Sequence, residues 1–192
     1  MATILDKITA IANNAIIRAS DRDLSDEHFC ERILLTSKVK APKLNLDQTQ
    51  VKIEKESISY RNAPPGINFS LSGNNIIEYV LYKIPITGDL EIFANLAGRY
   101  INRQTVYVDS STLYYKEYSN SIITGNEELI NDIKGRVLQL AERIKIPLQE
   151  FEAEIEQFYQ DELKPKIYAA IEVERNKRNS KSDSETKLNP FK

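Results

Sequence analysis

The chain has 192 residues, of which 41% are hydrophobic and 28% charged, and its formal net charge is −2. This length predicts one domain with one modest core, with room for a helical appendage. The near-neutral charge excludes a global field that would attract nucleic acid or a membrane surface. Cys30 is the only cysteine, which excludes an internal disulfide and fits a reducing compartment. Residues 1–17 lack a basic start and a cleavage site, so we expect a cytoplasmic protein with no signal peptide.

The first forty residues carry helical spacing. Apolar residues at i, i+3, i+4 and i+7 predict a helix over 2–19. A polar turn is expected at 20–26, after which Ser25 and Asp26 are suited to cap a second short helix. Pro42 marks the limit of that helix. The beginning of the chain is therefore predicted to be a helical pair.

The spacing of apolar residues then changes to two, as on half-buried strands. Pro85 within this zone predicts a sheet edge or a bulge, and residues 90–96 favour a short helix. Because the strands are clustered rather than alternating with helices, the predicted fold class is α+β with an antiparallel sheet of about four to six strands. Strand-like runs lie at 44–46, 51–53, 58–60, 67–71, 76–86, 105–108 and 113–118, the last two as a hairpin, with turn signals at 62–66, 73–75 and 87–89.

From residue 126 to about residue 180 an apolar residue recurs every three or four positions, which predicts long C-terminal helices. Gly125 and Asn126 precede two glutamates and mark the start. We expect Pro147 to separate two helices. A slip of five residues between Phe158 and Leu163 comes just before Pro165, so we expect the helix to bend near Glu162.

These patterns predict three parts: an α+β domain over 1–125, a helical segment over 126–180, and a polar, disordered tail over 181–192. The apolar stripe of the helical segment is longer than a small core needs. It is therefore predicted to pack on the sheet domain, on a second copy or on another protein. The candidate interface residues are Ile155, Phe158, Ile167 and Ile171.

No residue pattern predicts a catalytic, cofactor-binding or metal site. His28 lies two residues from Cys30, whereas a metal site needs a convergent set of ligands, so a surface or capping histidine is the favoured interpretation. Asp89 and Glu91 flank a turn, where two solvated carboxylates are more common than a bound cation. The six glycines are scattered and form no phosphate-binding loop.

Basic and aromatic residues indicate nucleic-acid binding as an alternative function. Tyrosines interleaved with Lys83, Arg99, Arg103 and Lys116 are able to stack on single-stranded bases, although tyrosine is also simply a favoured strand residue. A basic cluster near the chain's end supplies the candidate nucleic-acid contacts, which are Arg175, Lys177, Arg178 and Lys181. The dipole-matched, solvated helix end remains the simpler interpretation of that cluster.

The run Tyr82-Lys-Ile-Pro-Ile-Thr-Gly-Asp-Leu90 is similar to a short sequence motif in the N-terminal region of bacterial proteins of the restriction-nuclease type. In that group a helical segment with periodic Leu and Ile leads to a basic end, as Ile167 and Ile171 lead to residues 175–178 here. A nuclease-like domain then follows, which we expect this chain to lack. The resemblance spans residues 76–180. It implies a regulatory or assembly role in bacterial defence and carries over no catalytic residue.

A restriction-type site needs an acid followed by an acid–any–lysine triplet on an adjacent strand. The triplet occurs only at Glu162–Lys164 and Glu185–Lys187, in the helical segment and the tail. We therefore predict a non-enzymatic interaction or oligomerisation module with a second copy or another protein as partner, and no cofactor or membrane association. Nucleic-acid binding is the alternative, and a divergent enzyme with an unrecognised site is the third possibility.

Overall fold

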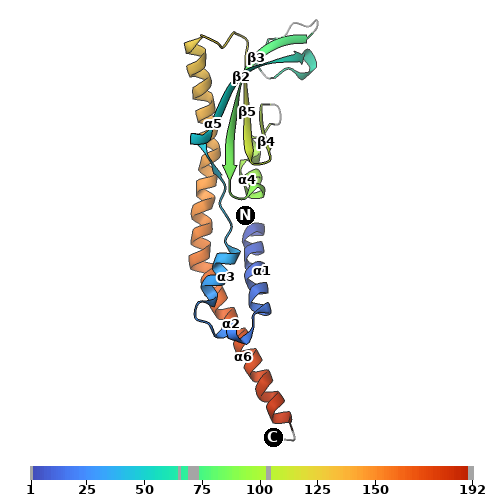
Figure 1. Ribbon diagram of the computed structural model, residues 1–192, viewed down its shortest axis with the longest axis vertical. Helices are drawn as coiled ribbons and strands as arrows, with labels where there is room; N and C mark the ends of the chain where they lie inside the picture. Colours follow the sequence, from blue (N-terminus) through green and yellow to red (C-terminus); the bar gives the residue numbers. More distant parts are fainter. Residues whose placement is uncertain (1, 65, 69–73, 103–104, 190–192) are drawn as a thin grey trace. The chain divides into compact units, whose positions relative to one another are not determined.

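A computed structural model of the chain describes residues 2–64, 66–68, 74–102 and 105–189 (Figure 1). It divides into two compact units, one of residues 40–151 and one that joins residues 1–39 to residues 152–192. This division differs from the predicted boundary at residue 126, which lies inside the first of these units. The predicted α+β class with an antiparallel sheet is confirmed.

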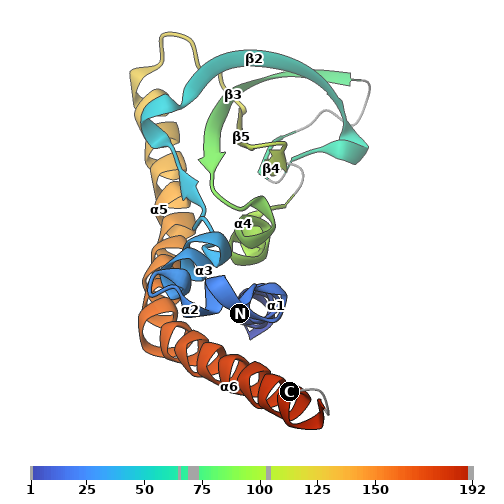
Figure 2. The ribbon, with the colours of Figure 1, turned by 60° about the horizontal axis from the view of Figure 1, so that its bottom comes forward.

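The 40–151 unit is built on an antiparallel sheet whose central strand is β3 (Asn74–Thr87). One side of β3 pairs with β5 (Thr112–Ser119), which in turn pairs with β4 (Val106–Asp109). The other side pairs first with β2 (Gln50–Ser59) and then with the short β1 (Lys43–Leu44). Figure 2 shows the long strand β2 curving strongly along the sheet. The strand predicted at 67–71 lies mostly outside the described residues.

Pro85 lies where the neighbour of β3 changes from β2 to β1. The carbonyl of Pro85 accepts a hydrogen bond from the backbone N–H of Asn45 at 2.9 Å, so this residue faces the β1 side. The ladder with β2 ends at the Gln50–Lys83 pair, two residues away. The missing N–H of Pro85 therefore falls at a break in pairing on one side of the central strand, rather than at the predicted sheet edge or bulge.

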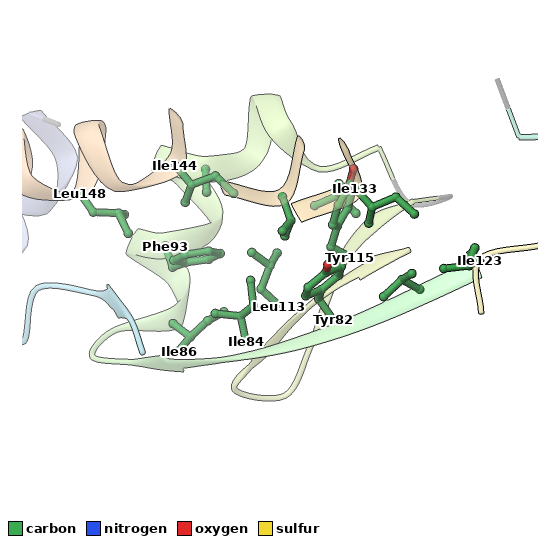
Figure 3. Packing of buried hydrophobic residues seen from close by; sticks show 14 residues of the cluster. Tyr82, Ile84, Ile86, Phe93, Leu113, Tyr115, Ile123, Ile133, Ile144 and Leu148 are labelled. Carbon is green, nitrogen blue, oxygen red and sulfur yellow. The ribbon is translucent and has the colours of Figure 1, made fainter. Parts of the chain in front are cut away.

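One face of the sheet packs against α4 (Leu90–Ala97) and α5 (Glu127–Gln157). Figure 3 shows Phe93 of α4 between sheet residues such as Ile84 and Leu113 and helix residues such as Ile144. Phe93, Leu113 and Ile144 are completely buried. Alternation along β3 and β5 turns every second side chain toward this core.

Two polar side chains cap the N-termini of these helices. Asp89 caps α4, because its carboxylate accepts the backbone N–H groups of Glu91 and Ile92 at 2.9 and 3.1 Å. Asn126 caps α5 by accepting the N–H of Leu129 at 3.1 Å, so the predicted start of that helix is confirmed. The Asp89 carboxylate thus caps the helix, whereas the sequence favoured a merely solvated side chain at this position.

The long C-terminal helix is continuous through Pro147, so the predicted break there is wrong. Ile144 and Leu148 on either side of the proline are both buried, and their packing holds the helical path despite the missing N–H. The predicted slip and bend correspond to a π-helical segment, Phe158–Leu163, directly before α6 (Lys164–Leu188). Within it the N–H of Lys164 donates to the carbonyl of Tyr159, five residues back. One wider turn therefore absorbs the extra residue before Pro165.

The second unit packs three N-terminal helices against the end of α5, the π-helical segment and α6. These are α1 (Ala2–Arg18), α2 (Asp21–Ser25) and α3 (Phe29–Ser37). The polar turn predicted at 20–26 contains α2 instead, because Ser20 and Asp23 form a reciprocal capping box. Residues 181–188, predicted to be disordered, continue α6.

The four candidate interface residues lie inside this unit rather than on its surface. Ile155, Phe158, Ile167 and Ile171 are between 1% and 7% exposed in the single chain. The apolar side chains of the chain's own N-terminal helices, among them Ile8, Ala12, Ile16 and Ile33, are buried in the same unit. The stripe is therefore covered within one chain.

A buried tyrosine ties α3 to the π-helical segment. The hydroxyl of Tyr159 donates to the carbonyl of Ser37 and accepts the N–H of Val39, both at 2.8 Å. Two backbone groups at the end of α3 that would otherwise be unpaired are thus satisfied. Burial is the main reason why the pKa of Tyr159 is raised.

Candidate protein-interaction surface

An apolar groove of about 470 Å³ lies within the 40–151 unit, between the start of β2 and α5. The sheet supplies the buried side chains of Tyr82 and Ile84. The helix supplies Val137 and Ala141, also buried. The complete lining is Leu46, Thr49, Val51, Tyr82, Ile84, Lys134, Val137, Leu138 and Ala141. With only one charged residue in this set, the groove suits an apolar side chain better than a polar one.

Large apolar side chains are exposed at and beside this groove. Val51 and Leu138 line it and are 54% and 60% exposed, and Ile53 follows Val51 on the same side of β2 at 45%. Full burial of such a side chain is worth about 1.5–3 kcal/mol relative to exposure. Single exposed apolar residues are ordinary, whereas a group beside an apolar groove is typical of a binding surface.

The strand that carries Val51 and Ile53 lies at the edge of the sheet. β2 pairs with β3 from Gln50 to Ser59, and no other strand among the described residues pairs with it. Its other edge therefore presents a row of backbone N–H and C=O groups. Such a row is the feature that a second strand recognises when it is added to a sheet.

The direction of those groups follows from the hydrogen bonds of β3. Ile86 donates its N–H to Ser111, next to β5, whereas Pro85 faces β1. The ladders of β3 are continuous, so its odd-numbered residues face β2 and pair with the even-numbered residues Lys52 and Glu54. Val51, Ile53 and Lys55 must then direct their backbone groups away from the sheet.

The opposite face of the sheet carries polar and aromatic side chains that bond to one another. Lys116 donates to Glu56 at 2.9 Å and lies 4.8 Å from the centre of the Tyr79 ring, which is itself 5.3 Å from the ring of Tyr118. The bond to Lys116 lowers the pKa of the Glu56 carboxyl. Burial, followed by a hydrogen bond to Glu54, raises the pKa of Tyr79 to about 12. This part of the tyrosine-rich region therefore holds the sheet together.

Other tyrosines pair in the same way. The rings of Tyr107 and Tyr114 are stacked 4.9 Å apart, and Lys83 lies 5.8 Å from the second ring. Tyr82 and Tyr115 belong to the core beneath α5. Most of the tyrosines singled out in the sequence thus contact each other or the core.

The four candidate nucleic-acid contacts on α6 all have acidic neighbours. Arg178 bonds Glu174, Asp21 and the carbonyl of Ala19 at 2.9, 3.0 and 2.8 Å. Arg175 pairs with Glu172 and also donates to the carbonyl of Leu24. The remaining two, Lys177 and Lys181, are 77% exposed and lie 3.8 and 3.7 Å from Glu174 and Glu185. The two arginines therefore anchor α6 to α2 and to the residue Ala19 just before it.

Residues with metal-binding or nucleophilic chemistry do not converge. His28 is 75% exposed at the start of α3, 3.5 Å from Glu27. Cys30 is buried, which raises the pKa of its thiol. The described residues include no group of His, Cys, Asp and Glu side chains able to hold a metal ion. No helix in the described part of the chain has the length and apolar character needed to cross a membrane.

Comparison with protein-family models, with curated proteins and with solved structures finds no match. The surface that stands out was not identified from the sequence as an interface. Its signal is the short run from Val51 to Glu54, in which apolar and charged residues alternate.

Proposed function

We propose that this chain is a non-enzymatic protein-interaction module that takes up an extended, apolar segment of a protein at β2. The observation that carries the proposal is the unpaired edge of β2 beside the apolar groove. An added strand would meet the outward backbone groups of Val51, Ile53 and Lys55. Alternate side chains of that strand would then lie over Val51 and toward Leu138 and the groove.

The two parts of the surface supply different kinds of selectivity. Backbone hydrogen bonds along the edge are independent of side-chain identity and are each worth about 0.5–1.5 kcal/mol net. The groove favours an apolar side chain, because each Å² of apolar surface removed from water contributes about 25 cal/mol to the binding free energy. The preferred ligand is therefore a short β-forming segment with apolar residues at every second position.

The nucleic-acid alternative gains less support from the geometry. Arg175 and Arg178 bind carbonyl groups of their own unit, and Lys116 is held by Glu56. An assembly role in bacterial defence is compatible with an interaction module, and it rests on the sequence resemblance of residues 76–180 alone.

A displayed library of random peptides tests the proposal. Panning against the immobilised protein should enrich peptides with apolar residues at alternating positions. In nuclear magnetic resonance spectra of the labelled protein, such a peptide should shift the amide signals of residues 50–55 and 134–141. Failure to enrich any peptide, or shifts confined to other parts of the chain, would refute the proposal.

Two substitutions on α5 form a matched pair for the binding assay. Leu138→Glu places a charge in the groove and should weaken peptide binding at least tenfold, equivalent to about 1.4 kcal/mol. Ile146→Glu alters a residue of the same helix that is 52% exposed and does not line the groove. Binding by that variant should equal the wild type. Equal losses in both variants would contradict a role for the groove.

A further inference from the structure

We infer that the segment added to β2 is β2 of a second copy, paired antiparallel about a twofold axis at Ile53. This inference rests on the proposed function and names the partner of the same surface. Two copies of one strand form a closed, symmetric pair, because each supplies the same edge to the other. The direction of the backbone groups and the charges along β2 restrict the register.

The backbone restricts the possible registers. Since Val51, Ile53 and Lys55 point their N–H and C=O groups outward, hydrogen-bonded pairs form only between odd-numbered residues of the two copies. The twofold axis must then pass through a residue pair rather than between two residues. With the axis at Ile53, Val51 of each copy faces Lys55 of the other, and Ile53 faces itself.

The charges select among these registers. With the axis at Ile53, each Lys52 faces the Glu54 of the second copy, and each Gln50 faces Glu56. An axis one residue earlier places Lys52 opposite itself, and an axis one residue later places Glu54 opposite itself. Like charges directly opposite each other destabilise a pair of strands, whereas opposite charges stabilise it.

A twofold axis farther from Ile53 shortens the paired segment, places like charges opposite each other, or leaves the apolar side chains without partners. An axis at Val51 leaves only residues 50–52 paired, because β2 begins at Gln50. An axis at Lys55 places that lysine opposite itself, and an axis at Ser57 leaves Val51 and Ile53 without partners. The Ile53 register is the one that combines length, an apolar contact between the two Ile53 side chains and matched charges.

Of the two charged side chains that would face each other, Lys52 is exposed and has no ion pair within the described part of the chain. The Glu54 carboxylate accepts the Tyr79 hydroxyl at 2.7 Å through one of its two oxygens. Val51 and Ile53 are about half exposed on the groove side of β2, so the second copy's strand would extend the apolar surface. An edge strand with charges of one sign resists association, whereas the alternating Lys52-Ile53-Glu54 sequence complements a second copy of itself.

Disulfide cross-linking distinguishes the registers directly. Lys52→Cys and Glu54→Cys are made separately in a Cys30→Ala background and mixed under mild oxidation. In the Ile53 register these cysteines form a pair about 4.5 Å apart between Cα atoms, within the range of a disulfide. The mixture should give a covalent dimer at least ten times faster than either variant alone. An Ile146→Cys variant gives the rate of random collision.

Two results of this experiment would overturn the inferred register. Rapid dimer formation by Lys52→Cys alone would place the axis at Lys52, and rapid formation by Glu54→Cys alone would place it at Glu54. If the mixed dimer and the two homodimers of Lys52→Cys and Glu54→Cys all form at the collision rate, pairing through β2 in these registers is excluded.

Solution mass provides an independent test without cysteines. Sedimentation equilibrium of the wild type should show dimer at about 100 µM, a concentration suited to a small interface. Lys52→Glu and Glu54→Lys should each be monomeric, because each creates two like-charge pairs, and the double variant should dimerise again. A wild type that stays monomeric while library peptides still bind β2 would refute self-pairing and leave the proposed function intact. A monomer that binds no peptide would refute both.

Discussion

At the scale of single residues, Gly88 shows how one backbone position joins β3 to α4. Its φ of +86° is left-handed, and a Cβ atom there would lie 2.4 Å from the carbonyl oxygen of Ala41 and 2.7 Å from Cα of Pro42. Both contacts are backbone atoms and have no room to move. The glycine therefore permits a turn and a close approach of two chain segments.

We predict that Gly88→Ala lowers the free energy of unfolding by about 3 kcal/mol, because strain and a backbone clash add together. Gly125→Ala is the matched control, since Gly125 has a φ of +81° but no atom within 4 Å of an added Cβ. Its cost should be about 1–2 kcal/mol, from the left-handed conformation alone. Urea unfolding followed by circular dichroism measures both. Equal losses would show that the close approach to Ala41 has no energetic weight.

The Glu56–Lys116 pair gives a prediction for pH dependence. The pKa of Glu56 is lowered in the folded protein, chiefly by its hydrogen bond from Lys116. Below the ordinary carboxyl range near pH 4.5 the unfolded chain therefore binds more protons than the folded one, and stability falls as pH decreases. Glu56→Gln should remove about 0.5–1 kcal/mol at pH 7, a range suited to a partly exposed pair.

The same variant should lose less stability than the wild type between pH 5 and the lowered pKa. Urea unfolding at a series of pH values measures the difference. Glu150→Gln, an exposed position on α5, removes a carboxylate without touching this pair and should keep the wild-type pH profile. Identical profiles for Glu56→Gln and the wild type would contradict the predicted contribution of the pair.

At the scale of elements, the C-terminal helices accommodate two prolines in different ways. Pro147 lies inside α5, where its missing N–H and the clash of its ring with the preceding turn have no local remedy. Pro165 comes in the first turn of α6, directly after the π-helical segment. The wider turn before Pro165 already separates the carbonyl groups that its ring would meet.

We therefore predict that Pro147→Ala raises the free energy of unfolding by about 1–3 kcal/mol, because it restores a helical hydrogen bond. Pro165→Ala should change it by less than about 0.5 kcal/mol, since the π-helical segment has already adjusted the backbone. Both prolines are at least partly exposed, so little packing is lost in either variant. Thermal and urea unfolding compare them. Destabilisation by Pro147→Ala would show that α5 needs a bend at this position.

At the scale of the whole molecule, the chain divides into two units that each cover part of the C-terminal apolar stripe. Residues such as Ile133 and Ile144 pack in the sheet unit, and Phe158 and Ile167 pack among the N-terminal helices. The stripe thus serves two cores in succession.

We predict that Phe158→Ala lowers the free energy of unfolding by about 3–5 kcal/mol, as for other buried aromatic residues. The loss should be localised: amide hydrogen exchange should become faster in residues 1–39 and 152–188 than in the sheet unit. The solution mass at a concentration that keeps the protein folded should equal the wild type. A smaller solution mass without faster exchange would restore Phe158 as an interface residue.

The sequence by itself determined the elements whose pattern is local. The helix over residues 2–18, strand β3, the β4–β5 hairpin and the start of α5 follow from the spacing of apolar residues and from caps such as Asn126. The slip of five between Phe158 and Leu163 even located the π-helical segment. These features depend on residues within one or two turns of each other, so their signal is complete in a short stretch of chain.

Only the tertiary structure decided what covers each apolar surface. The spacing of Ile155 and Phe158 is the same whether a second copy or the chain's own N-terminal helices bury them. The alternation of Val51, Ile53 and the charges between them is equally compatible with a central strand and with an edge. Which of these holds depends on contacts between segments far apart in sequence, and periodicity carries no information about the identity of the neighbour. The groove and the open edge of β2 therefore became visible only in the folded chain.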